Sequence, residues 1–146
     1  MAGDQDLVRA KAFVCRGSLT PDLAKSALST ENPGSVVQAV RLEATDNELF
    51  IEMLAAQTFQ AMSSGSILAR KPEIDLLLRL AGTTQIEKAI RTQGAKGGAP
   101  FIAIVAGLED PKRPPGFSGE ELPSRRLNRA ELCRIERAAL LGAERA

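Results

Sequence analysis

The tightest constraint in this sequence lies between residues 72 and 90, where two helices must meet with almost no chain between them. Pro72 suits the first turn of a helix, because its missing N–H would have had no partner there. Asp75 places negative charge near the positive end of the helix dipole. Gly82 ends this helix, because glycine takes the left-handed conformation without a Cβ penalty. The sequence therefore predicts a sharp corner between two helices.

The predicted corner gathers groups that bind anions. Thr84 and Glu87 have the spacing of a capping box, which indicates the start of the second helix. We expect the free N–H groups of that helix, the hydroxyls of Thr83 and Thr84 and the amide of Gln85 to lie beside Arg79. Such a site can hold a phosphate. Capping boxes are common, however, so the alternative interpretation is that these residues only end one helix and begin another.

Charge is unevenly distributed along the chain, although the formal net charge is only +1. Residues 1–69 hold five basic and eight acidic side chains, whereas residues 70–98 hold six basic and three acidic ones. A local excess of cations favours a polyanionic partner. The alternative is a solvated surface, because the patch is small beside those of dedicated nucleic-acid binders. In that case the chain is a scaffold that binds only other proteins.

The segment from Lys71 to Ile90, KPEIDLLLRLAGTTQIEKAI, resembles the signature block of a known family. That family is the small tRNA-recruiting accessory subunit of the KEOPS complex, the archaeal relative of human TPRKB. The resemblance extends to the order of elements. An N-terminal strand, a long helix before the block and an apolar strand after it are followed by a C-terminal helix with an IERxALL pattern at residues 135–141.

The resemblance implies a non-catalytic subunit of the complex that attaches threonylcarbamoyl to an adenosine next to the tRNA anticodon. It further implies binding to the kinase-like ATPase subunit and recruitment of tRNA through its 3′ CCA end. The tRNA contacts that it implies are Arg70, Lys71, Arg79, Gly82, Thr83, Thr84 and Gln85, with Lys88, Arg91 and Lys96 as outer electrostatic support. We expect the terminal helix to offer Leu132, Ile135 and Leu140 to the kinase-like partner.

Composition leaves little material for catalysis. The chain has no histidine, which removes the commonest general base and the commonest metal ligand. The cysteines, Cys15 and Cys133, are expected to be buried, and the sequence leaves a disulfide between them open. We therefore expect no catalytic residue, no metal, no cofactor and no small-molecule substrate. The longest apolar run, residues 101–106, is too short to span a bilayer, and no signal peptide is expected, so the prediction is a cytoplasmic protein without a membrane partner.

The pattern of strands and helices predicts one α/β domain over residues 1–146. Strands are expected at residues 8–16, 35–44 and 101–106. The second should have one buried and one partly wet face, and the third should be covered on both faces. The family resemblance implies a sandwich with a small, largely antiparallel central sheet covered by helices. Four prolines and a glycine that break regular structure predict an irregular loop over residues 107–127: Pro111, Pro114, Pro115, Gly116 and Pro123.

Capping residues predict the remaining helices. Thr20 begins a short helix, Thr45 and Glu48 form a capping box for a long helix, and Gly65 ends it. The apolar face of the long helix is expected to hold Phe50, Met53, Leu54, Gln57 and Ala61. A terminal helix at residues 128–141 is expected to be capped by Asn128 and Glu131, with a stripe made by Leu132, Ile135 and Ala139.

Overall fold

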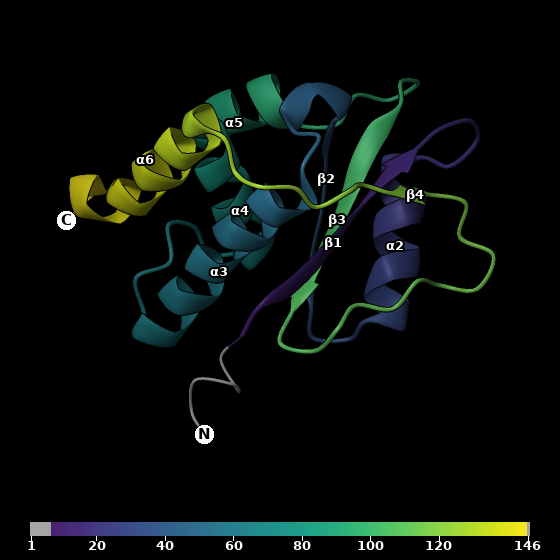
Figure 1. The fold of residues 1–146 in the computed structure, drawn as a ribbon, viewed down its shortest axis with the longest axis horizontal. Helices are drawn as coiled ribbons and strands as arrows, with labels where there is room; N and C mark the ends of the chain where they lie inside the picture. The colour runs from purple at the N-terminus through teal and green to yellow at the C-terminus, as the bar shows by residue number, and fades with distance from the viewer. Residues whose placement is uncertain (1–6, 146) are drawn as a thin grey trace.

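The computed structural model describes the backbone of residues 7–145 and the side chains of residues 7–143, and it shows a four-stranded sheet packed against helices (Figure 1). The strands are β1 Arg9–Cys15, β2 Val36–Arg41, β3 Phe101–Gly107 and β4 Glu120–Glu121. The helices are α2 Pro21–Glu31, α3 Glu48–Ser64, α4 Pro72–Ala81, α5 Ile86–Gln93 and α6 Arg129–Arg145, with a 3-10 turn η1 at Leu42–Ala44. The expected α/β class with an antiparallel sheet is confirmed.

Strand β3 lies inside the sheet, whose order is β2-β3-β1-β4. It pairs antiparallel with both β1 and β2, for example through Ala103, which lies opposite Phe13 and Ala39. All seven residues of β3 are buried. This burial explains why every residue of the strand is apolar, as the sequence predicted, because neither face meets water.

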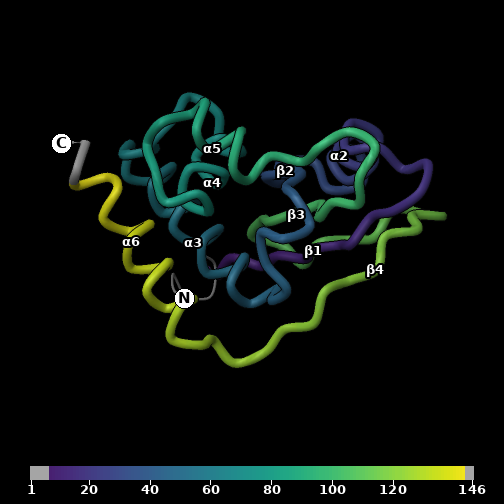
Figure 2. Tube along the Cα trace, turned by 90° about the horizontal axis from the view of Figure 1, so that it is seen from above, coloured from purple at the N-terminus to yellow at the C-terminus, as the bar shows by residue number. Residues whose placement is uncertain are grey.

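The two faces of the sheet carry cores of unequal size. Helices α3 to α6 and the larger core lie on one side, and α2 covers the other (Figure 2). Phe13 points into the smaller core and Ala12 into the larger one, because neighbouring side chains of a strand face opposite ways. The prediction of a partly wet face on β2 was wrong. Helix α2 packs on one face of β2 and α4 on the other, so every residue from Val36 to Val40 is buried.

Two predicted helix starts are confirmed by hydrogen bonds. The hydroxyl of Thr20 accepts from the N–H of Leu23 at 3.2 Å and caps α2. At α6 the capping box is reciprocal. The N–H of Glu131 donates to the Asn128 side chain at 2.8 Å, and the N–H of Asn128 donates to the Glu131 carboxylate at 3.0 Å. Helix α6 continues to Arg145, past the expected end at residue 141.

The predicted capping box at Thr45 and Glu48 was wrong. Asn47 caps α3 by accepting from the N–H of Leu49 at 3.2 Å. The Glu48 carboxylate instead accepts from the N–H of Ala12 on β1 at 2.9 Å, which satisfies a donor on the outer side of that strand. Gly65 ends the helix with φ 73°, as predicted. Met53, expected on the apolar face of α3, is 40% exposed.

Residues 108–127 form a long strap that contains the short strand β4. Strand β4 pairs with β1, and beyond it the N–H of Leu122 donates to the carbonyl of Ala12 at 2.7 Å. The carbonyl of Pro123 then accepts from the N–H of Glu48 at 2.9 Å. From there the strap crosses the molecule to reach α6 (Figure 2). Irregular structure was predicted for residues 107–127; β4 departs from that prediction, and Gly107 belongs to β3.

Candidate nucleic-acid interface

The corner between α4 and α5 forms at Gly82, the position that the sequence predicted. Gly82 ends α4 with φ 72° and ψ 34°, and its N–H donates to the carbonyl of Leu78 at 2.8 Å. The predicted capping box of Thr84 and Glu87 was wrong, because α5 begins one residue later and has no side-chain cap. The Thr83 hydroxyl instead accepts from the N–H of Gln85 at 3.1 Å. The first N–H groups of α5 therefore lack a capping side chain, and they carry the positive end of its dipole.

Strand β2 holds both helices of the corner from one side. The Gln38 amide donates to the carbonyl of Glu73 in the first turn of α4 at 2.8 Å. A β-bridge joins Val40 to Gly94 at the end of α5, and the Arg41 guanidinium donates to the carbonyl of Arg91 at 2.6 Å. These three contacts fix the start of α4 and the end of α5 against β2, the edge strand of the sheet. The backbones that carry the cations of the two helices therefore have a fixed position relative to the corner.

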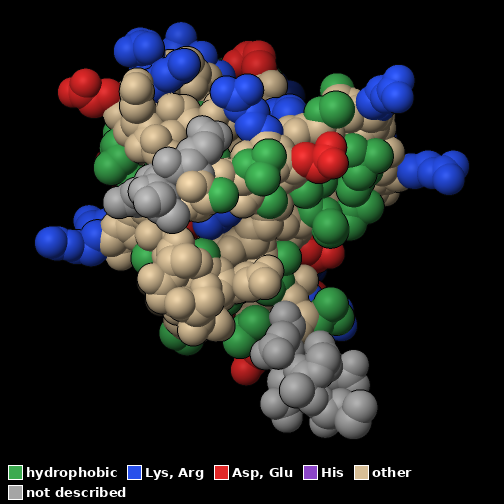
Figure 3. All heavy atoms as spheres, turned by 90° about the vertical axis from the view of Figure 1, so that its left-hand side faces the viewer, with side chains coloured by type: hydrophobic (Ala, Val, Ile, Leu, Met, Phe, Trp, Pro, Cys, Tyr) green, Lys and Arg blue, Asp and Glu red, His purple; other side chains and the backbone are tan. Residues whose placement is uncertain are grey.

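Five of the six cations predicted to contact nucleic acid are exposed: Arg70, Lys71, Lys88, Arg91 and Lys96. None of them forms a salt bridge with any residue that the structure describes. Lys88 and Arg91 are three residues apart on α5 and share a face. Figure 3 shows Lys and Arg side chains gathered at the upper end of the face that carries α6, where α5 lies in Figure 1. The structure therefore leaves these charges open to a polyanion.

The four uncharged residues predicted for the site all lie at the corner itself. Thr84 and Gln85 are exposed, whereas Gly82 and Thr83 are half-buried. Gly82 is covered by α6, because its carbonyl accepts from the Arg137 guanidinium at 3.1 Å. The structure thus brings Thr83, Thr84 and Gln85 together beside the start of α5.

Arg79 is the exception among the predicted cations, because it points into the interior. Its side chain is only 5% exposed. The guanidinium donates to the Asp75 carboxylate through Nε at 2.6 Å and to the carbonyl of Ala138 through Nη1 at 3.2 Å. The expectation that Arg79 lies beside Thr83 and Thr84 as an anion ligand is not met in this conformation. A contact with an anion would require breaking a buried ion pair, which is strongly destabilising.

Two aliphatic residues of α5 were missed by sequence reasoning. Ile86 is 46% exposed and Ile90 is 52% exposed, and their spacing of four residues places them on one face. Only Ala89 of this helix is buried. The available signal was the alternation of isoleucines with Lys88 and Arg91 on a helix too short to bury more than one narrow face. The exposed surface of α5 therefore combines cations with apolar contact area.

The three residues of α6 that were predicted to contact a partner differ in exposure: two are exposed and one packs against the core. Leu132 and Leu140 are 49% and 60% exposed, respectively. Ile135 is half-buried and packs against the larger core, and its carbonyl accepts from the Gln57 amide at 3.0 Å. Ala138 and Leu141 form the buried side of the helix.

The two cysteines are both free and lie in different environments. Cys15 is buried as predicted, and burial raises the pKa of its thiol to about 11, although a backbone hydrogen bond with Ala103 lowers it. Cys133 is exposed, so the expectation that it is buried was wrong. It lies on the outer side of α6, which packs through other positions.

Among residues whose placement is described, no group of three or more cysteine, aspartate and glutamate side chains is arranged to hold a metal ion. Within the same part of the chain, no helix has the length and apolar character needed to cross a membrane. In comparisons with known proteins, no family model and no curated protein sequence matched this chain.

Proposed function

We propose that this chain is a non-catalytic, cytoplasmic accessory subunit of the KEOPS type, which recruits tRNA through the corner between α4 and α5. One observation carries the proposal. Lys88 and Arg91 are exposed, lack salt bridges among the described residues, and lie on a helix whose N-terminus has no side-chain cap. A helix N-terminus and nearby cations are the two features that attract phosphate most strongly.

The 3′ CCA end of tRNA is the proposed ligand because it is single-stranded. Unpaired nucleotides present both phosphates and free base faces to a protein. On α5, Lys88 and Arg91 are suited to the phosphates, and the exposed Ile86 and Ile90 supply apolar surface for the bases or sugars. Arg70 and Lys71, just before α4, and Lys96, just after α5, add exposed positive charge at the other ends of the two helices.

The kinase-like ATPase subunit is the proposed protein partner, and α6 is the proposed contact. Leu132 and Leu140 are large apolar side chains that remain about half exposed. Exposed apolar residues are common singly, but two on one terminal helix favour a protein contact. Ile135 belongs mainly to the core and is assigned a supporting role in holding α6 in place.

A second candidate function is a scaffold that binds only proteins. The burial of Arg79 favours it, because the charges of Asp75 and Arg79 in the signature block then stabilise the fold and do not contact RNA. On this reading Lys88 and Arg91 are solvated charges, and Ile86 and Ile90 contact a protein. The two functions differ in what a tRNA-binding experiment shows.

The experiment measures binding of intact tRNA, and of tRNA lacking its CCA end, at several salt concentrations. The test variant is Lys88→Ala with Arg91→Ala, and the control is Arg9→Ala with Arg16→Ala, which removes the same charge from exposed positions on β1 and just after it. Circular dichroism checks that every variant is folded. For a single strand, each lost phosphate contact lowers the log–log salt slope by roughly 0.7, so the double variant should lose about 1.4.

Three outcomes decide between the candidates. Weaker binding and a lower slope for the α5 variant alone support tRNA recruitment through the corner. Equal binding of both tRNAs by the wild type removes the CCA assignment. Equal loss in the α5 variant and in the control, or no tRNA binding at all, favours the scaffold.

A further inference from the structure

A groove lies at the end of the sheet where β1 begins and β3 ends. Its two halves have volumes of about 420 Å³ and about 310 Å³, and they share Phe59 and Leu108 as lining residues. In Figure 1 this end of the sheet is the lower one, whereas α5 lies at the upper end. The groove is therefore separate from the corner that we propose for tRNA.

The larger half of the groove has an apolar floor. Val8 of the segment leading into β1 forms part of it, beside Ala56 and Phe59, which are three residues apart on α3. Leu108 follows β3 directly and is 53% exposed, although it adjoins Phe59. A large aliphatic side chain left open beside a half-buried ring provides surface for another apolar side chain.

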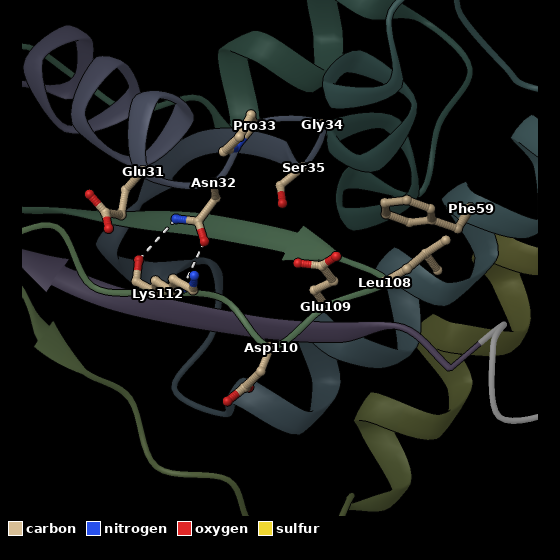
Figure 4. A pocket seen from close by; sticks show the side chains of 10 residues that line it. All are labelled: Glu31, Asn32, Pro33, Gly34, Ser35, Phe59, Leu108, Glu109, Asp110 and Lys112. Carbon is tan, nitrogen blue, oxygen red and sulfur yellow. Dashed lines mark hydrogen bonds between the residues drawn. The ribbon is translucent and has the colours of Figure 1, made fainter.

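The smaller half of the groove carries a surplus of negative charge. Three carboxylates line it, from Glu31 at the end of α2 and from Glu109 and Asp110 after β3, against the single cation Lys112. None of the three makes a salt bridge with a residue in the described part of the chain. Figure 4 shows Glu31 and Glu109 on opposite sides of Asn32, with Phe59 beside Leu108 at the other end.

The acidic half is held rigid by two hydrogen bonds between distant segments. The Asn32 amide donates to the carbonyl of Lys112 at 2.9 Å, and the N–H of Lys112 donates to the Asn32 side-chain oxygen at 2.7 Å (Figure 4). Asn32 itself is 8% exposed. These bonds join the end of α2 to the segment after β3, so the backbone segments that carry Glu31 and Glu109 are fixed relative to each other before any partner arrives. Such preorganisation lowers the entropy cost of binding.

We propose that this groove docks a basic, amphipathic helical segment of a partner protein. Aliphatic side chains of the segment would contact Phe59 and Leu108, and its lysines or arginines would lie between Glu31 and Glu109. Charge complementarity selects this occupant, because the unpaired carboxylates repel nucleic acid and anionic membrane surfaces. An apolar strip flanked by charge is the pattern that binds amphipathic helices. The proposal does not rest on tRNA recruitment, which uses the opposite end of the molecule.

The test uses two labelled model peptides that differ only in charge. One is an amphipathic helix of leucine and lysine, and the other has glutamate in place of each lysine. Binding to the full chain is followed by fluorescence anisotropy, and the site is located by amide shifts in the isotopically labelled protein. We expect the lysine peptide to bind about tenfold or more tightly than the glutamate peptide. Its largest shifts should fall at residues 31–35, 56–63 and 107–112.

A matched pair of variants separates the groove from general attraction. Leu108→Ser with Glu109→Lys changes the groove, and Leu23→Ser with Asp22→Lys makes the same changes at exposed positions on the first turn of α2. The groove variant should lose about tenfold or more in affinity, and the control should keep it. Equal affinities for the two variants, shifts outside the groove, or no binding of the lysine peptide would each overturn the proposal. No RNA enters the assay, so its failure leaves the tRNA proposal standing.

Discussion

The Asp75 carboxylate holds the Arg79 guanidinium across one turn of α4, with Oδ1 at 2.6 Å from Nε and Oδ2 at 3.1 Å from Nη2. Both side chains are buried. Asp75 also accepts from the Thr58 hydroxyl at 2.6 Å and from the N–H of Leu68 at 2.9 Å. Because Arg79 donates in turn to the carbonyl of Ala138, the pair joins α3, α4 and α6.

Removing the charge of Asp75 should destabilise the fold. Asp75→Asn keeps the shape of the side chain but leaves Arg79 buried without a counter-charge, so we expect a loss of about 3–5 kcal/mol in the free energy of unfolding. Urea denaturation measures it. The double variant Asp75→Asn with Arg79→Met should lose less than the sum of the single losses, because no unpaired charge remains. Additive losses would contradict the coupling.

Replacing Gly82 should cost more than replacing Gly65, although both glycines end helices in the left-handed conformation. Their φ values are 72° and 73°, so Gly→Ala carries a similar backbone penalty of about 1–2 kcal/mol at each. A Cβ at Gly82 would also lie 3.0 Å from Nε of Arg137, whereas one at Gly65 meets nothing within 4 Å. Thermal unfolding of the two variants isolates this contact. Equal losses would mean that Arg137 moves aside freely.

The Glu48 carboxyl should make the fold more stable in mild acid than in base. Burial raises its pKa from 4.5 to about 7; the N–H of Ala12 and the charge of Lys11 lower it, and the Glu121 carboxyl raises it. Because the folded state binds this proton more tightly, its contribution is fully present below pH 4.5 and is lost as pH rises through about 7. The difference in unfolding free energy between wild type and Glu48→Gln should therefore decline over that window.

Two measurements check the titration of Glu48. Urea denaturation of both proteins across the window gives the difference in unfolding free energy, and carbon NMR of the side-chain carboxyl gives the midpoint directly. We expect a midpoint near 7. A midpoint close to 4.5 would show that the carboxylate is solvated.

Substitutions on α6 should separate folding from partner binding. Leu140→Glu changes a side chain that is 60% exposed, so its unfolding free energy should stay within about 0.5 kcal/mol of wild type. Ile135→Glu places charge against the larger core and should cost about 2 kcal/mol or more. If the proposed kinase-like partner binds α6, gel filtration with it should show lost binding for Leu140→Glu and retained binding for the control Leu23→Glu on α2. Retained binding by Leu140→Glu would remove α6 from the interface.

The sequence by itself determined the features that depend on neighbouring residues. A proline at the first turn, a glycine in the left-handed conformation and the box of Asn128 and Glu131 act over three or four positions, so Pro72 and Gly82 bounded α4 correctly. Strand β3 could also be predicted from the sequence, because a strand covered on both faces must be apolar throughout. Both capping boxes that began with threonine were predicted wrongly. Asn47 caps α3 in place of Thr45, and the Glu48 carboxylate accepts from the N–H of Ala12 on a strand distant in sequence. Helix α5 has no side-chain cap.

Only the tertiary structure decided which side of each helix met the core. Arg79 and Arg91 both lie on amphipathic helices of the same block, yet one is buried against Asp75 and the other is exposed. The helical period of the sequence is the same whether such an arginine is buried or exposed, so the pattern alone does not distinguish the two. The choice depends on partners distant in sequence, such as Ala138 for Arg79, and on how many neighbours pack around each helix. Helix α5 touches its surroundings through one narrow face, so Ile86 and Ile90 stay in solvent where their apolar character alone would have buried them.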